Sequence, residues 1–288
     1  MEKLLHWSIA NSQGDQQTKE RVGQPDPKLL EQLFGTGPDE PTLMKQSMTV
    51  ITNPEADLEN KLTAFDNFEM LIENMDNANN IENLKLWNPL LQQLESPETD
   101  LRTYALSCVG TASQNNVKTQ DDFLKYDGGL RKVIELASDI NEPNEVRTKA
   151  LYALSNLIRN HSKSSEAFCE LRGLEVIPPI VHDTKANNKL KMRAISLLSA
   201  FLTSSTINEG LMDLLRKEGI VESTIDCLNM PFDVYIADRV LNILAQMVTA
   251  NVQFTDGEKQ KLQAGMQSIE PEQDRLNEDD LQTVKYVL

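Results

Sequence analysis

The sequence is poor in cysteine. It has three cysteines in 288 residues, Cys108, Cys169 and Cys227, and no Cys-x-x-Cys spacing. Closely spaced cysteine and histidine ligands are the usual signature of a structural zinc site, and a disulfide framework needs more paired cysteines. We therefore expect no metal site and no disulfide, and we expect all three cysteines to be buried, reduced thiols.

Catalytic motifs are also missing. The three histidines, His6, His161 and His182, lie far apart in the sequence, so we expect each to be a surface or packing residue. The sequence contains no phosphate-binding loop, no dinucleotide-binding glycine motif, no His-Glu-x-x-His and no Gly-x-Ser-x-Gly. The sequence therefore favours a protein that is not an enzyme and that uses no cofactor.

Basic residues and long apolar runs are scarce as well. There are 28 Lys and Arg against 44 Asp and Glu, which gives a formal net charge of −16. A general nucleic-acid binder needs a basic face, so we expect no such activity. The first residues lack the apolar run of a signal peptide, and no stretch reaches the roughly 20 apolar residues that cross a membrane. We expect a monomer in the cytoplasm that binds no membrane, with a nuclear pool left open.

The sequence does contain a helical repeat of about 45 residues. A small residue recurs within similar segments at steps of 45, 44 and 46, at Ala105, Ala150, Ala194 and Val240. The period falls in the roughly 40–47-residue range of HEAT and armadillo repeats. A second series with the same period, Gly129, Gly173 and Gly219, predicts junctions where one helix ends and the next begins. We predict an all-α, armadillo-like α-solenoid with four full repeats flanked by capping helices.

The repeats divide the chain into three parts. Residues 1–40 form a polar, Gly- and Pro-rich N-terminal arm that we expect to be mobile. Its apolar residues Leu4, Leu5, Trp7 and Ile9 either contact a partner transiently or dock on the solenoid as a cap. Residues 41–257 form the repeat domain, and residues 258–288 form C-terminal capping helices.

Within the repeat domain, helical spacing predicts an N-terminal cap with one buried stripe, consisting of Leu58, Leu62, Phe65, Phe68, Leu71 and Ile72. The last helices of the four repeats are predicted near 99–115, 144–160, 188–204 and 233–250. Pro178 and Pro179 should delay or kink the helix that contains them, because proline disrupts a helix interior.

In an armadillo-type unit the third helix lines a groove. Lys149, Arg193 and Arg239 occupy equivalent positions in three successive repeats, so they predict a positive stripe on one face. An ordinary solvated helix face is the alternative. Nuclear-import adaptors carry a ladder of Asn in this groove, but here that position reads Thr111, Asn156, Ala200 and Gln246. A positive groove would repel a basic peptide, so we expect an acidic protein partner.

Several segments carry a more specific resemblance. They are Met1–Asn11, Gln24-Pro25-Asp26-Pro27, Glu73–Asn80, Gly110–Asn116, Gly129–Lys132 and Val146–Leu151. With them, nearly the whole chain resembles the fungal armadillo-type nucleotide-exchange factors of cytosolic heat-shock protein 70 chaperones, which are relatives of the animal heat-shock-protein-70-binding protein.

The resemblance implies a co-chaperone that grips one lobe of the chaperone's ATPase domain and accelerates ADP release, so that ATP enters and the client leaves. It also implies that Leu4, Leu5, Trp7 and Ile9 mimic a client. The contact positions that it implies on the groove face are Ala78, Asn79, Thr111, Gln114, Lys149, Arg193 and Arg239. We expect Arg193→Ala and Ala78→Arg to weaken binding without unfolding the protein. The alternative is a passive armadillo scaffold for another acidic protein.

Overall fold

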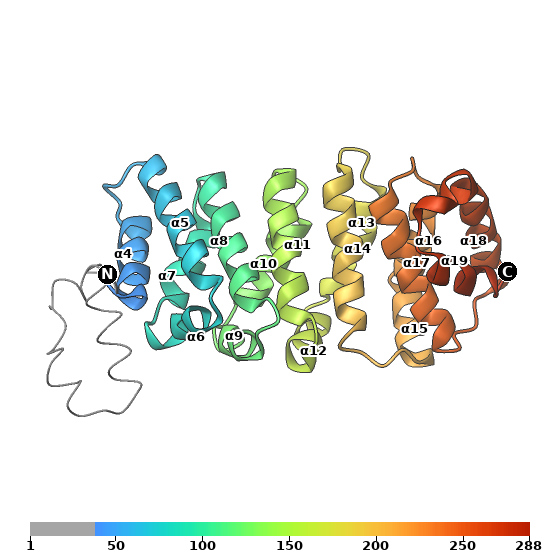
Figure 1. The fold of residues 1–288 in the computed structure, drawn as a ribbon, viewed down its shortest axis with the longest axis horizontal. Helices are drawn as coiled ribbons and strands as arrows, with labels where there is room; N and C mark the ends of the chain where they lie inside the picture. Colours follow the sequence, from blue (N-terminus) through green and yellow to red (C-terminus); the bar gives the residue numbers. More distant parts are fainter. Residues whose placement is uncertain (1–37) are drawn as a thin grey trace, which may run out of the picture. The chain divides into compact units, whose positions relative to one another are not determined.

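A computed structural model describes residues 38–288 of the chain (Figure 1). The arm residues Leu4, Leu5, Trp7 and Ile9, and also His6, lie outside the described residues. Contacts between Cα atoms divide the chain into residues 1–43 and 44–288. The arrangement described below is therefore that of residues 44–288.

All regular structure in residues 38–288 is helical, as predicted. The helices α4 (Glu40–Thr52) and α5 (Leu58–Ile72) come first, and α18 (Asp256–Ile269), η4 (Glu270–Arg275) and α19 (Glu278–Lys285) come last. Between them the chain repeats a unit of three helices four times.

Each unit has a short first helix, a second helix that is often extended by a 3-10 turn, and a long third helix. The first helices are α6 (Met75–Asn83), α9 (Val117–Phe123), α12 (Ser162–Glu170) and α15 (Glu209–Lys217). The second helices are α7 (Trp87–Gln92) with η1 (Gln93–Glu95), α10 (Gly129–Ser138), α13 (Ile177–His182) with η2 (Gly173–Val176), and α16 (Ile220–Asp226) with η3 (Cys227–Asn229). The third helices are α8 (Thr99–Ser113), α11 (Asn144–Ile158), α14 (Asn188–Leu202) and α17 (Val234–Thr249).

The third helices form one layer of the fold. Helix α8 packs against α5 and α11, α11 packs against α14, and α17 packs against α14 and α19 (Figure 1). Ala105, Ala150, Ala194 and Val240 are fully buried. Small side chains at these positions allow neighbouring helices to approach closely, and this explains the repeat that the sequence shows. The ends of the four third helices lie within two residues of their predicted positions.

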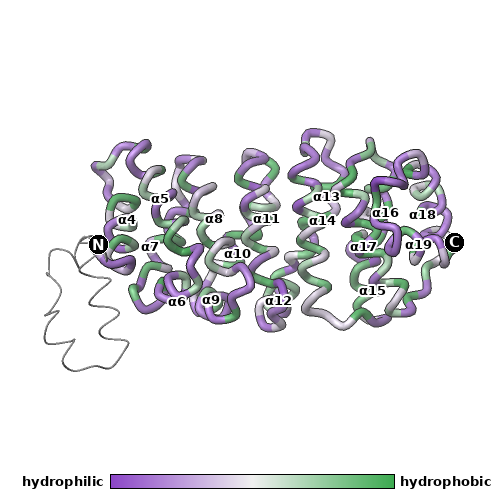
Figure 2. Tube along the Cα trace, in the orientation of Figure 1, coloured by the Kyte–Doolittle hydropathy of each residue, from purple (hydrophilic) through white to green (hydrophobic). Residues whose placement is uncertain are grey.

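The other helices form parallel rows. Helix α9 packs against α6 and α12, and α16 packs against α13 and α18. Hydrophilic residues gather at the turns between helices, whereas apolar residues lie within the helices (Figure 2). Each unit therefore buries its apolar side chains against its neighbours, as in other solenoids.

The junctions between first and second helices use a left-handed backbone conformation. The residues with positive φ there are Lys85 (59°), Gly128 (80°), Arg172 (58°) and Gly219 (70°). The predicted glycines lie at these junctions, but Gly129 and Gly173 begin the next helical segment and are not themselves left-handed. Gly173 is needed for a different reason, because a Cβ atom there would lie 2.2 Å from Cε2 of Phe168.

The proline pair behaves as predicted. Residues Gly173–Val176 form a 3-10 turn, and the α-helix begins only at Ile177, so Pro178 and Pro179 lie in its first turn. Backbone N–H groups in the first turn have no partner within the helix, so proline costs little there.

The two ends of the solenoid are closed by additional helices. At the N-terminal end Phe65, Phe68 and Ile72 are buried and Leu62 and Leu71 are partly buried, but Leu58 is 37% exposed. The prediction for Leu58 was wrong: this residue is the first of α5, and its side chain is exposed. At the C-terminal end a capping box between Thr255 and Glu258 starts α18, and α19 then covers α17.

Candidate protein-binding face

A row of polar side chains crosses the layer of third helices. Ser107 Oγ of α8 donates a hydrogen bond to Glu69 Oε1 of α5 at 2.5 Å, and it accepts one from Lys149 Nζ of α11 at 2.8 Å. Thr111 Oγ1 donates to the same Glu69 oxygen at 2.8 Å. We call the side of these helices that carries Glu69, Ser107, Lys149, Tyr152, Arg193 and Arg239 the third-helix face.

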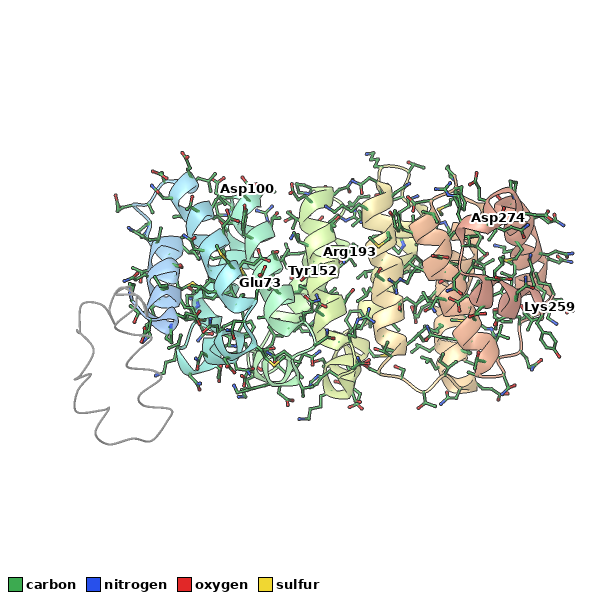
Figure 3. All side chains as sticks on the ribbon, in the orientation of Figure 1. Glu73, Asp100, Tyr152, Arg193, Lys259 and Asp274 are labelled. Carbon is green, nitrogen blue, oxygen red and sulfur yellow. The ribbon has the colours of Figure 1, made fainter. Side chains whose placement is uncertain are left out.

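Tyr152 occupies the middle of this face. Its ring centroid is 5.6 Å from Lys149 Nζ and 5.1 Å from Arg193 Cζ, both within the range of cation–π attraction. Its hydroxyl oxygen lies 3.4 Å from Thr111 Oγ1. Figure 3 shows Arg193 beside Tyr152, where α14 meets α11. One aromatic ring therefore links side chains from three successive third helices.

Lys149 and Arg193 meet at the Tyr152 ring, and Arg239 holds the equivalent sequence position on α17, but the three charges are not equally available. Lys149 donates to Ser107, whose hydroxyl is bonded to the carboxylate of Glu69, so part of its charge is offset within the protein. Arg193 is half-buried and Arg239 is exposed. Neither arginine has a carboxylate oxygen within 4 Å among the residues that the structure describes. The net positive part of the stripe therefore lies on α14 and α17.

A fourth cation strengthens this positive region. Burial lowers the pKa of the Arg159 guanidinium, at the end of α11, and the positive charge of Arg239 lowers it further. Within residues 38–288 neither Arg159 nor Arg239 forms an ion pair with a carboxylate, so these like charges produce a positive field, which attracts an anionic surface.

The remaining predicted contact residues are divided between two parts of the fold. Thr111 and the exposed Gln114 lie at the end of α8. Ala78 and Asn79 lie on α6, in the row of first helices, and Asn79 O accepts a hydrogen bond from Lys118 Nζ of α9 at 3.1 Å. Ala78 is only 2% exposed, so its side chain offers almost no surface to a partner.

Helical spacing assigns Tyr152 to this face, and Ser107 at the equivalent position one repeat earlier, but it does not assign Glu69. A signal existed for Tyr152, which lies three residues after Lys149 and hence on the same side of the helix. Glu69 had none, because it is 38 residues before Ser107 and only the packing of α5 on α8 joins the two.

The thiols and histidines have structural environments. Cys108 and Cys227 are buried as predicted, but Cys169 is only half-buried, because it lies near the end of α12. Burial raises the pKa of Cys227 to about 12. His161 is buried and caps α12, its Nδ1 accepting from Ser164 N at 3.2 Å, and His182 is an exposed residue whose Nε2 lies 3.1 Å from Ser223 Oγ.

Neither metal-binding nor membrane-spanning features are found in the described part of the chain. Residues 38–288 contain no group of three or more His, Cys, Asp or Glu side chains that could hold a metal ion. Over the same range, no helix combines the length and the apolar character that a membrane span requires.

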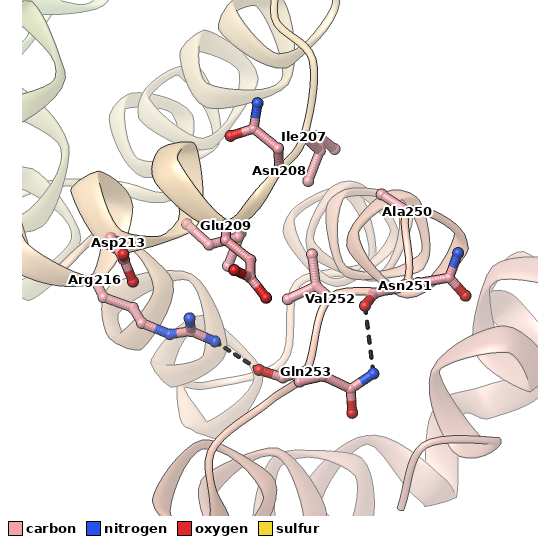
Figure 4. Close-up of a pocket in the computed structure, with 10 residues that line it drawn as sticks. Ile207, Asn208, Glu209, Asp213, Arg216, Ala250, Asn251, Val252 and Gln253 are labelled. Atoms are coloured by element: carbon pink, nitrogen blue, oxygen red, sulfur yellow. Dashed lines mark hydrogen bonds between the residues drawn. The ribbon is translucent and has the colours of Figure 1, made fainter.

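A surface cleft of about 520 Å³ lies between α15 and the segment that follows α17 (Figure 4). Its cation, Arg216, donates to Gln253 O at 2.8 Å and to Glu258 Oε1 at 2.8 Å, so that charge is paired within the protein. The lining residues include no histidine or cysteine. Its other charged lining residues are the carboxylates Glu209 and Asp213.

Comparison with known proteins gives two family matches. A family described as nucleotide exchange factor Fes1 matches residues 1–81, and the SIL1/FES1/HPBP1 C-terminal domain matches residues 77–222. The chain is 60% identical over 290 residues to the Hsp70 nucleotide exchange factor FES1 of Saccharomyces cerevisiae, with 100% of each chain covered. It is 57% identical to the protein of the same name in Kluyveromyces lactis, with 100% of this chain and 99% of the relative covered.

Solved structures with the same fold include designed armadillo repeat proteins. One, YIII(Dq)4CqI, has a TM-score of 0.66 at 14% identity and covers 87% of this chain and 98% of its own. Another, solved in complex with the peptide (KR)4, has a TM-score of 0.65 at 14% identity, with the same coverage. These likenesses confirm the armadillo-like fold. The full-length relatives and the two matched families show that the chain belongs to the Fes1 family of nucleotide exchange factors.

Proposed function

We propose that this chain is a non-catalytic co-chaperone that binds an Hsp70 chaperone and accelerates ADP release, so that ATP enters and the client leaves. The full-length likeness to relatives named Hsp70 nucleotide exchange factor FES1 supports this function. A protein of this kind supplies binding energy and no chemistry. It speeds release if it binds the opened chaperone more tightly than the closed one, and about 5.5 kcal/mol of difference would shift a 1:99 equilibrium to 99:1.

The proposed contact surface is the third-helix face, and the proposed target is the chaperone's ATPase domain, bound by a monomer of this protein. The observation that supports it is the pair Arg193, which is half-buried, and Arg239, which is exposed, two cations on neighbouring helices without a carboxylate partner in the described chain. An acidic surface on the target would supply the missing negative charge. The buried layer of third helices keeps the two cations at a set spacing, which favours a rigid, preformed surface.

The test is the rate at which labelled ADP leaves the purified chaperone, measured by stopped flow at increasing concentrations of this protein. Wild type should accelerate release. Arg193→Ala and Arg239→Ala should each raise the concentration for half-maximal effect by about tenfold, which corresponds to about 1.4 kcal/mol. Lys259→Ala is the matched control, because Lys259 is an exposed cation on α18 at the C-terminal end (Figure 3).

The outcomes separate the alternatives. A passive scaffold would bind the chaperone and leave ADP release unchanged. Equal half-maximal concentrations for wild type and both arginine variants would show that the contact surface lies elsewhere. Because surface charge pairs are screened by salt, the advantage of wild type over Arg239→Ala should also shrink as ionic strength rises.

For the N-terminal arm we propose a separate role. Leu4, Leu5, Trp7 and Ile9 would occupy the chaperone's client site, which takes short apolar stretches, and so prevent recapture of the client. Deletion of residues 1–30 should leave ADP release intact and slow client discharge. Equal client discharge with and without the deletion would remove this role.

We further propose a cytoplasmic location, because the resemblance is to factors of cytosolic chaperones. Imaging of a fluorescent fusion, with fractionation as a second measure, tests this. Exclusive recovery in a membrane-enclosed secretory fraction would contradict it.

A further inference from the structure

We propose that Tyr152 is a positioning residue: its ring holds the Arg193 guanidinium in the place from which that group meets the partner. The proposal rests on the proposed function and adds a residue through which Arg193 acts.

The surroundings of Arg193 show how its position is set. No carboxylate oxygen lies within 4 Å of it, and its Nε is enclosed with no hydrogen-bond acceptor, within the described chain. The ring of Tyr152 lies 5.1 Å from its Cζ. Because no acceptor orients this guanidinium, the Tyr152 ring holds it: the electron-rich ring attracts the planar cation.

Tyr152 is in turn held from the other side. Its hydroxyl lies 3.4 Å from Thr111 Oγ1, and Thr111 donates to Glu69 Oε1. The backbone of Gly110 on α8 leaves room for the ring, because a Cβ atom there would come within 2.4 Å of Tyr152 Cε1. Helix α8 therefore sets the orientation of a ring on α11, and that ring sets the position of a cation on α14.

Lys149 provides an internal contrast. It also lies near the ring, with Nζ 5.6 Å from the centroid, but Ser107 Oγ accepts a hydrogen bond from it at 2.8 Å. Loss of the ring should thus release Arg193 and leave Lys149 in place. Substitution of Tyr152 should therefore weaken partner binding only by displacing Arg193.

A double-mutant cycle tests this in the ADP-release assay, with wild type, Tyr152→Leu, Arg193→Ala and the double variant. Tyr152→Leu should raise the half-maximal concentration by about two- to tenfold, and it should add nothing once Arg193 is Ala. Tyr152→Phe keeps the ring and should stay within about twofold of wild type. Tyr152→Met replaces Tyr152→Leu in the cycle if urea unfolding shows the leucine variant to be partly unfolded.

A spectroscopic measurement gives a second readout. The ring current of Tyr152 should shift the Arg193 Nε–Hε resonance, and the shift should persist in Tyr152→Phe and disappear in Tyr152→Leu. A full Tyr152→Leu effect in the Arg193→Ala background, or a Tyr152→Phe defect as large as that of Tyr152→Leu, would overturn the positioning role. If wild type itself fails to accelerate ADP release, the proposed function fails instead, and the resonance shift then decides the positioning of Arg193 alone.

Discussion

Gly110 on α8 lies against the aromatic ring of Tyr152 on α11, so closely that a Cβ atom at position 110 would be 2.4 Å from Tyr152 Cε1. The backbone is close as well, since the Cα atom of Ala153 would lie 3.2 Å from that Cβ. Glycine is therefore required here by the contact between two helices. The same contact orients the ring on the third-helix face.

We expect Gly110→Ala to lower the free energy of unfolding by about 1–3 kcal/mol, because the added methyl group overpacks the contact between α8 and α11. Urea unfolding measures this. Gly257→Ala in α18 is the control, since a Cβ atom at Gly257 would meet nothing within 4 Å, and it should leave stability unchanged or raise it by up to about 1 kcal/mol. Equal free energies of unfolding for Gly110→Ala and wild type would show that α8 and α11 can move apart to fit the methyl group without loss of stability.

Ala78→Arg should destabilise the protein, contrary to the expectation from sequence that it would act on binding alone. Ala78 is buried, so an arginine there must displace its neighbours or carry a charge into the core, and we expect a loss of about 2 kcal/mol or more. Met75→Arg on the same helix is the control, because Met75 is 57% exposed. Comparable urea midpoints for the two variants would contradict the burial of Ala78.

The thiols should differ in reactivity. Burial raises the pKa of Cys108, Cys169 and Cys227, but Cys169 is only half-buried. With a disulfide reagent at pH 8, the native protein should therefore react first at Cys169, and the other two should react only as the protein unfolds. Cys169→Ser should remove the fast phase. A fast phase that survives this substitution would show that another thiol is accessible.

Tyr126 should make stability depend on alkaline pH. Its hydroxyl donates to Glu82 Oε2 at 2.6 Å, and burial, with a smaller effect of the Glu82 carboxylate, raises the pKa of Tyr126 to about 12. In the unfolded chain the phenol loses its proton near pH 10. The folded state holds the proton more tightly, so the contribution is fully present below about pH 10 and is lost as pH rises toward about 12.

Urea unfolding of wild type and Tyr126→Phe at several values from pH 8 to pH 11.5 isolates this contribution. Wild type should be the more stable at pH 8, by about 0.5–1.5 kcal/mol, and the difference should fall as pH rises from about 10 to 11.5. A difference that stays constant over this interval would contradict the raised pKa.

Much of the fold could be predicted from the sequence, because helical periodicity is a local property. The recurrence of Ala105, Ala150 and Ala194 identified the third helices, and their ends followed within two residues. The two prolines at 178 and 179 correctly predicted a late helix start. Prediction was weaker for the junction residues, whose roles depend on tertiary contacts. In the third unit the left-handed residue is Arg172, and Gly173 is instead required by its close approach to the Phe168 ring.

The sequence by itself determined that the chain repeats, that each repeat is helical, and that Lys149, Arg193 and Arg239 occupy equivalent positions. Only the tertiary structure decided what each of those positions contacts. Lys149 is bonded through Ser107 to Glu69, Arg193 rests on Tyr152, and Ala78 is enclosed. The reason is physical: spacing along a helix specifies which side a residue faces, whereas its neighbours come from other helices about 40 residues away, whose packing sets the contacts.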